Sequence, residues 1–241
     1  MKLKPIRTIT ALAIALSLVG ATALAVPASA ATTDTRYITI SATGSTSVVP
    51  DAVRITATVS VVGATAKAAL GTAGVSSSAV RAALAANKVS TKDFATQSIT
   101  VYPEYSYPPT GNPVISGYRA SQSFDITVRA AKTAGAVVDA IVEAGGDNVQ
   151  VNGVSPFVLD TSKAIQSART SAVVRAKAKA ASYAKLLGIK LGRVIYLDET
   201  SAGTPSPIYS MTAKADSAAT VVDLGEQKVS VSVTIRWAIG K

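Results

Sequence analysis

Two segments of this chain alternate apolar and polar residues with a strict two-residue period. In residues 53–61 the odd-numbered positions hold Val, Ile or Ala, and the even-numbered positions hold Arg, Thr or Ser. Residues 229–237 repeat the pattern, with Val, Ile and Trp against Ser, Thr and Arg. This period predicts a strand with one face in a core and the other in solvent, as is usual in antiparallel sheets.

Turn and helix signals place the remaining elements. Further strands are expected over residues 37–42, 94–107, 114–129, 149–159 and 194–197, and helices over 64–86 (one or two, because it contains Gly71 and Gly74), 132–144 and 162–187. Residues 201–220 are expected to form an exposed loop. The resulting order β-β-α-β-β-α-β-α-β-β predicts an α+β fold, with an antiparallel or mixed sheet and helices packed on one face.

The longest predicted helix follows a cap at residues 160–162 and ends at Gly188. Its expected apolar stripe consists of Ile165, Ala168, Ala172, Ala176, Ala180, Tyr183 and Leu187. Arg169 falls near the middle of this stripe. We expect its stem to pack and its guanidinium to reach a carboxylate or the helix edge, because long basic side chains usually do so. The alternative is an anion or partner site.

The sequence contains neither Cys nor His. Disulfide frameworks, Ser-His-Asp triads, Cys-His nucleophile pairs, haem bound through His or Cys, and zinc sites built on imidazole or thiolate are therefore excluded. Neither of the two glycine-rich nucleotide-binding fingerprints occurs. These absences remove most of the constellations by which an enzyme is identified from sequence.

Two weaker motifs remain. Ser182 and Lys185 match the S-x-x-K pattern of serine acyl-enzymes, but the partner motifs are missing and the match lies near the end of an amphipathic helix. Asp198 and Glu199 are adjacent on a strand, so their side chains should diverge instead of sharing a metal. We therefore predict that the protein is not an enzyme, with no catalytic, cofactor-binding or metal residues and no cofactor.

The first thirty residues resemble a secretory signal peptide. Lys2, Lys4 and Arg7 precede an uncharged stretch over residues 9–26, and Pro27 precedes the small-x-small pattern at 28–30. We expect cleavage after Ala30, with an uncleaved membrane anchor as the alternative. The product would be an exported protein, periplasmic or extracellular and associated with the cell wall. No transmembrane span is expected after cleavage.

The net charge and the aromatic content of the chain indicate which classes of partner it could bind. Residues 31–241 carry 21 Lys+Arg and 14 Asp+Glu, a net charge of +7. Export and the 5% aromatic content argue against nucleic acid, so a weak attraction to anionic envelope polymers or lipid headgroups fits better. The strands expected at 94–107 and 114–129 form a predicted hairpin, whose turn is supplied by Pro108, Pro109, Gly111, Asn112 and Pro113. Tyr102, Tyr105, Tyr107 and Tyr118 gather in this hairpin, either as an interaction surface or as cross-strand packing.

Several segments resemble the SIMPL-domain family. They are Val49-Pro50-Asp51, the stretches 101–105 and 117–121, the Ala-rich helix 164–187 with the following 188–192, and the closing 224–226 and 229–235. The resemblance spans about residues 37–238 and marks 31–241 as one SIMPL-like domain after a signal peptide at 1–30. It implies an α+β fold, export to the envelope, a loose link to envelope or oxidative stress, and ring assembly in some members. It supplies no catalytic residues, and the lack of Cys and His argues against a thiol-based antioxidant role.

Two hypotheses follow. The first is an exported, non-enzymatic interaction or structural protein that forms homo-oligomers, which rests on the resemblance and on the Tyr-rich hairpin. The second is a binding module for anionic cell-envelope polymers, which rests on the positive charge.

Overall fold

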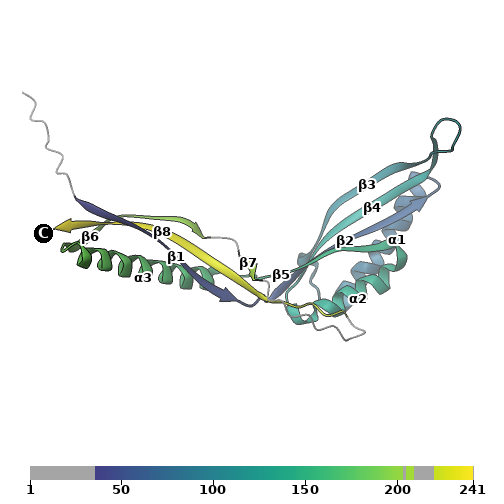
Figure 1. Cartoon of the computed structure of the whole chain (residues 1–241). Helices are drawn as coiled ribbons and strands as arrows, with labels where there is room; N and C mark the ends of the chain where they lie inside the picture. The colour runs from purple at the N-terminus through teal and green to yellow at the C-terminus, as the bar shows by residue number, and fades with distance from the viewer. Residues whose placement is uncertain (1–35, 203–204, 209–219, 241) are drawn as a thin grey trace, which may run out of the picture. The chain divides into compact units, whose positions relative to one another are not determined.

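The computed structural model describes residues 36–202, 205–208 and 220–240, and it has the α+β fold that we expected (Figure 1). The strands are β1 (Tyr37–Val48), β2 (Ala52–Gly63), β3 (Phe94–Ser106), β4 (Val114–Val128), β5 (Val149–Phe157), β6 (Lys190–Ala202), β7 (Ser206–Ile208) and β8 (Glu226–Gly240). The helices are α1 (Ala66–Ala86), α2 (Ala134–Gly145) and α3 (Ser162–Leu186), with single 3-10 turns at Thr91–Asp93, Ala131–Thr133 and Gly146–Asn148.

The antiparallel pairing is confirmed, but the strands divide between two sheets. Sheet A has the order β1-β8-β6, with β7 also paired to β8, and sheet B has the order β3-β4-β2-β5. We call β1, α3 and β6–β8 the sheet A lobe, and β2–β5 with α1 and α2 the sheet B lobe. The sheet B lobe is formed by one continuous stretch, residues 52–157, inserted between β1 and α3.

The core of the sheet B lobe lies between its sheet and the helices α1 and α2. The apolar positions of β2 identified from the alternating pattern are all buried. Phe124 on β4 is 1% exposed, and its ring stacks on that of Phe94 with centroids 4.9 Å apart. Figure 1 shows α1 and α2 alongside this sheet, so the apolar positions of β2 lie on the face that the helices cover.

The core of the sheet A lobe forms where α3 packs on β1 and β8. The buried helix positions recur every four residues and are all alanine: Ala164, Ala168, Ala172, Ala176, Ala180 and Ala184. Because alanine is small, the helix backbone comes very close to the sheet. A Cβ atom built on Gly44 of β1 would lie 2.2 Å from the Ala168 carbonyl oxygen and 2.2 Å from the Ala172 nitrogen. Gly44 therefore sets the spacing between the helix and the sheet.

The predicted stripe of α3 was correct in its centre and wrong at its C-terminal end. Tyr183 and Leu187 are 43% and 65% exposed, whereas Ala184 is buried. The expected stripe kept the spacing of a straight helix, in which steps of three and four residues alternate. The observed contact keeps a step of four throughout, so the buried line moves around α3 along its length.

Element boundaries agree closely with expectation where turn chemistry is strong. Gly188, with φ +65°, ends α3 as predicted, in a left-handed conformation that glycine adopts without steric cost. Residues 66–86 form one helix that includes Gly71 and Gly74. The expected loop at 201–220 is partly wrong, because β6 continues to Ala202 and β7 pairs with β8; residues 203–204 and 209–219 lie outside the described part.

Among the helices that the structure describes, none is long and apolar enough to cross a bilayer. The predicted signal peptide at 1–30 and its cleavage after Ala30 lie outside the described residues and stay predictions.

Candidate interaction surfaces

The hairpin of β3 and β4 is the most apolar exposed feature of the sheet B lobe. Its loop contains Pro108, Pro109, Gly111, Asn112 and Pro113, the turn residues identified in the sequence, and projects from the end of the sheet (Figure 1). Exposed large apolar side chains on the hairpin are Ile99 (56%), Tyr102 (63%), Tyr105 (47%), Tyr107 (75%), Val114 (56%) and Ile115 (53%). A concentration of exposed apolar side chains on one hairpin makes it a candidate interaction surface.

The four hairpin tyrosines do not share one role. Tyr118 is half-buried and packs against the core of the sheet B lobe, as the cross-strand packing interpretation predicts. Tyr102, Tyr105 and Tyr107 are exposed. β3 is also the edge strand of sheet B, with β4 as its one partner among the described strands. These three tyrosines are therefore available to a partner.

At the opposite end of the same two strands, Asp93 and Arg129 form a bidentate ion pair. Arg129 Nε donates to Asp93 Oδ2 at 2.8 Å, and Nη2 donates to Oδ1 at 2.7 Å. Asp93 is 9% exposed and directly precedes β3, while Arg129 directly follows β4. The hydrogen bonds from Arg129 lower the pKa of the Asp93 carboxyl below its ordinary value, against the opposing effect of burial. This pair joins the two strand ends.

The Asp93–Arg129 pair makes stability depend on pH in a definite direction. A carboxyl whose pKa is lower in the folded than in the unfolded state stabilises the fold above the unfolded pKa of about 3.9, and the stabilisation is lost as pH falls through the folded pKa. Asp93→Asn should therefore unfold at a lower urea midpoint than wild type at neutral pH, and the difference should shrink below about pH 4.

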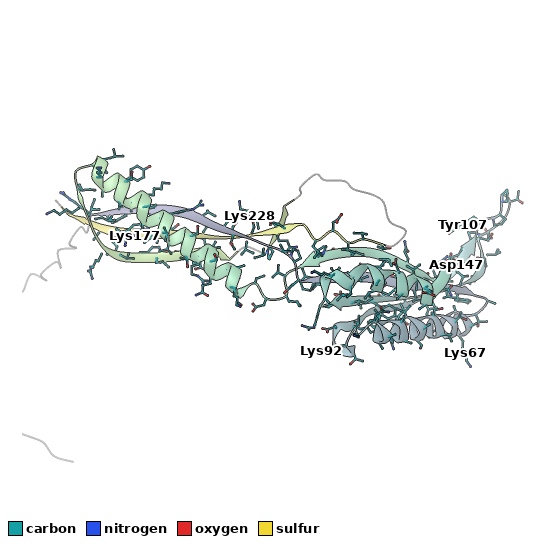
Figure 2. All side chains as sticks on the ribbon, turned by 90° about the horizontal axis from the view of Figure 1, so that it is seen from below. Lys67, Lys92, Tyr107, Asp147, Lys177 and Lys228 are labelled. Atoms are coloured by element: carbon teal, nitrogen blue, oxygen red, sulfur yellow. The ribbon has the colours of Figure 1, made fainter. Side chains whose placement is uncertain are left out.

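Urea unfolding of both proteins across a pH series measures this effect. Asp147→Asn is the matched control, because Asp147 is an exposed carboxylate of the same lobe (Figure 2). A deficit of Asp93→Asn that stays constant down to acid pH would show that the charge of Asp93 does not stabilise the hairpin base.

Arg169, the basic residue in the apolar stripe of α3, pairs with a carboxylate as expected. Its Nε donates to Glu199 Oε2 at 2.6 Å and its Nη2 to Oε1 at 2.8 Å, joining α3 to β6. These hydrogen bonds lower the pKa of Glu199. The neighbouring Asp198 is opposite Thr234 in the strand register and Glu199 is opposite Val233, so the two carboxylates lie on opposite faces of sheet A. The preferred interpretation of Arg169 is confirmed.

Ser182 and Lys185, the S-x-x-K pair, are both exposed in the last turns of α3. They lie on a convex helix surface, and no His, Cys, Asp or Glu cluster of three or more forms a potential metal site among the described residues.

A small apolar pocket that no sequence motif marks lies between the end of α1 and the start of β3. Its volume is about 320 Å³, and its lining includes Leu84, Val89 and Phe94. The Arg81 guanidinium lies 5.3 Å from the Phe94 ring centroid and donates to Thr96 Oγ1 at 3.3 Å. Helix and strand residues that are 10 to 15 positions apart form this pocket, so no local pattern reports it.

Positive charge is concentrated on α3 and the start of β6. Residues 161–197 hold eight Lys and Arg and no Asp or Glu, whereas the rest of residues 31–241 holds 13 basic and 14 acidic residues. Among the described residues, Arg169 is the one member of this segment that forms an ion pair. The net charge of +7 of residues 31–241 thus arises in this segment, and the charges of the other residues nearly balance.

A protein-family model and two known proteins match this chain, and the family model spans most of the described residues. A family model described as "SIMPL: Protein of unknown function (DUF541)" matches residues 38–237. Two proteins named "26 kDa periplasmic immunogenic protein", from Brucella melitensis biotype 1 and Brucella abortus strain S19, are each 34% identical to this chain over 159 residues. The match covers 61% of this chain and 62% of each relative, so it spans about three fifths of the relatives' length.

Proposed function

The chain belongs to the SIMPL family, and on this premise we propose that it is an exported, non-enzymatic protein of the cell envelope whose copies associate with one another. Export is supported by the signal-peptide pattern at residues 1–30 and by the two relatives, which are named as periplasmic proteins. A role in the response to envelope or oxidative stress is part of the proposal and rests on the family resemblance.

The observation that carries self-association is the exposed apolar hairpin. Tyr102 and Tyr105 on the edge strand β3, and Tyr107 directly after it, are 47–75% exposed. Tyrosine is enriched at protein interfaces because its ring buries a large apolar area and its hydroxyl still forms hydrogen bonds. Association through this hairpin would cover both the rings and the open edge of β3.

We expect the triple variant Tyr102→Ser, Tyr105→Ser, Tyr107→Ser to weaken self-association at least about 100-fold, because tyrosine anchors commonly contribute more than 1 kcal/mol each to an interface. Light scattering of the exported protein over a concentration series measures the change. The control makes the same three replacements in the sheet A lobe, at Tyr37, Tyr183 and Tyr196, which are 43–52% exposed. A hairpin variant with the mass of wild type at every concentration would show that the hairpin is not the interface.

Binding of anionic cell-envelope polymers is a second candidate function. The specific observation in its favour is the concentration of basic residues in 161–197, which would attract a polyanion at low ionic strength and lose it as salt is raised. This candidate uses the sheet A lobe, so it does not compete with the hairpin for the same residues.

A further inference from the structure

The basic residues of α3 are arranged in two rows. Arg169 faces β6, where it pairs with Glu199, and Lys177 and Lys185 follow it at multiples of four residues. On the other side, Lys179 and Tyr183 border β1, because they line a surface hollow with residues 38–41. Since buried positions recur every four residues along this helix, each row keeps to its own side of α3.

Between the two rows, the outward ridge of α3 is uncharged. Its positions are Gln166, Thr170, Val174, Ala178, Ser182 and Leu186. Its apolar members Val174 and Leu186 are 61% and 77% exposed, and Leu187, next to Leu186, is 65% exposed. These two leucines are not part of either described core. The C-terminal half of α3 thus has an uncharged ridge that ends in an exposed leucine pair and has cations on both sides.

Two further cations follow this helix in the sequence. Lys190 opens β6 directly after the turn at Gly188, and Arg193 follows it on the same strand. With Arg175, Lys177, Lys179 and Lys185, they give six exposed basic side chains over residues 175–193. Figure 2 shows Lys177 on α3 in the sheet A lobe. The nearest acidic residues in sequence, Asp160 and Asp198, lie outside this stretch.

We propose that the C-terminal half of α3 and the start of β6 dock on the surface of a bilayer that contains anionic phospholipids. Leu186 and Leu187 enter the boundary between headgroups and acyl chains, and the flanking Lys and Arg side chains reach the phosphate groups. A helix that lies in the interface has this distribution, with apolar residues toward the acyl chains and long basic residues at the headgroups. Each Lys or Arg near such a surface strengthens binding roughly fivefold.

The two exposed leucines favour a bilayer over a soluble polyanion. A polyanion would interact with the cations alone and would leave Leu186 and Leu187 in water. A bilayer offers both an anionic layer and an apolar layer beneath it, so it uses every exposed feature of this surface. Docking on a bilayer does not require self-association, because the hairpin belongs to the other lobe.

The test is co-sedimentation of the exported protein with vesicles of phosphatidylcholine, with and without phosphatidylglycerol. We expect binding to the vesicles that contain phosphatidylglycerol, weakened by salt, and little binding to phosphatidylcholine alone. The double variant Lys177→Gln, Lys185→Gln should bind roughly 30-fold more weakly, from the loss of two charges. The double variant Leu186→Ser, Leu187→Ser should also bind about tenfold more weakly while keeping its salt dependence.

The control variant Lys67→Gln, Lys92→Gln removes the same net charge from the sheet B lobe, where both lysines are exposed (Figure 2). We expect it to bind like wild type. An equal loss in this control would mean that overall charge, and not this surface, attracts the vesicle, and would overturn the proposal. Equal binding of wild type to both kinds of vesicle would also overturn it.

Two further measurements separate other occupants. In the first, the Leu186→Ser, Leu187→Ser variant binds vesicles as tightly as wild type, and the Lys177→Gln, Lys185→Gln variant loses the same fraction of its affinity for dextran sulfate as for vesicles. The surface would then be a polyanion site and not a bilayer site. If the leucine variant instead changed the solution mass in light scattering, the leucines would lie between copies of this chain. Either result contradicts bilayer docking, and an unchanged mass with weakened vesicle binding supports it.

Discussion

Gly44→Val should lower the free energy of unfolding by roughly 3 kcal/mol or more, which places it among the most damaging single substitutions in the sheet A lobe. The new Cβ would lie 2.2 Å from both the Ala168 carbonyl oxygen and the Ala172 nitrogen. Both are backbone atoms of a helix whose facing residues are already alanine, so no side chain can shrink to relieve the contact. The helix would have to move away from β1 and β8, which would open the alanine contact along its length.

Urea unfolding measures this loss of stability. Gly74 of α1 provides a control at which an added side chain should raise stability instead of lowering it. A Cβ built on Gly74 meets nothing within 4 Å. Gly74→Ala should therefore raise stability by about 0.5–1 kcal/mol, because alanine costs less backbone entropy in a helix. If Gly44→Val unfolded within about 0.5 kcal/mol of wild type, α3 would not be seated on β1 as the structure describes.

Phe124→Ala should cost about 3–5 kcal/mol, the usual loss for removal of a buried phenyl ring. Phe124 is 1% exposed on β4, stacks on Phe94, and lies 5.8 Å from the Arg81 guanidinium. Its removal would leave a cavity in the sheet B core and take away the ring that stacks on Phe94.

The same unfolding assay applies, with Tyr102→Ala as control. Tyr102 lies on the neighbouring strand but is 63% exposed, so its replacement should change stability by less than about 0.5 kcal/mol. A loss from Phe124→Ala no greater than that of the control would mean that the sheet B core is not packed around this ring.

Strand positions could be predicted from sequence because their signal is local. The alternation of β2 and β8 directly reports which side chains are buried, and those residues are buried in the structure. The division into two sheets could not be predicted in the same way. β1 pairs with β8 from Tyr37↔Ala238 to Val48↔Gln227, although these residues are far apart in the sequence. The alternating pattern within a strand shows which face is buried, but it does not identify the partner strand.

The two candidate surfaces differ in how much of each could be predicted from the sequence. The tyrosine cluster and the turn residues marked the hairpin, but only the structure separates the packed Tyr118 from the exposed Tyr107. On α3, the apolar stripe predicted for a straight helix included Leu187 as a core residue. The exposed pair of leucines was therefore not predicted. The observed step of four residues turns the stripe and leaves Leu186 and Leu187 in solvent between basic residues.

The most direct test of the proposed function is the solution mass of the exported protein, measured by light scattering over a wide range of concentrations. Self-association through the hairpin predicts a discrete multimer that the hairpin tyrosine variant converts toward monomer. A protein that stays monomeric at every concentration would contradict the proposal and leave the basic surface of α3 as the main interaction site.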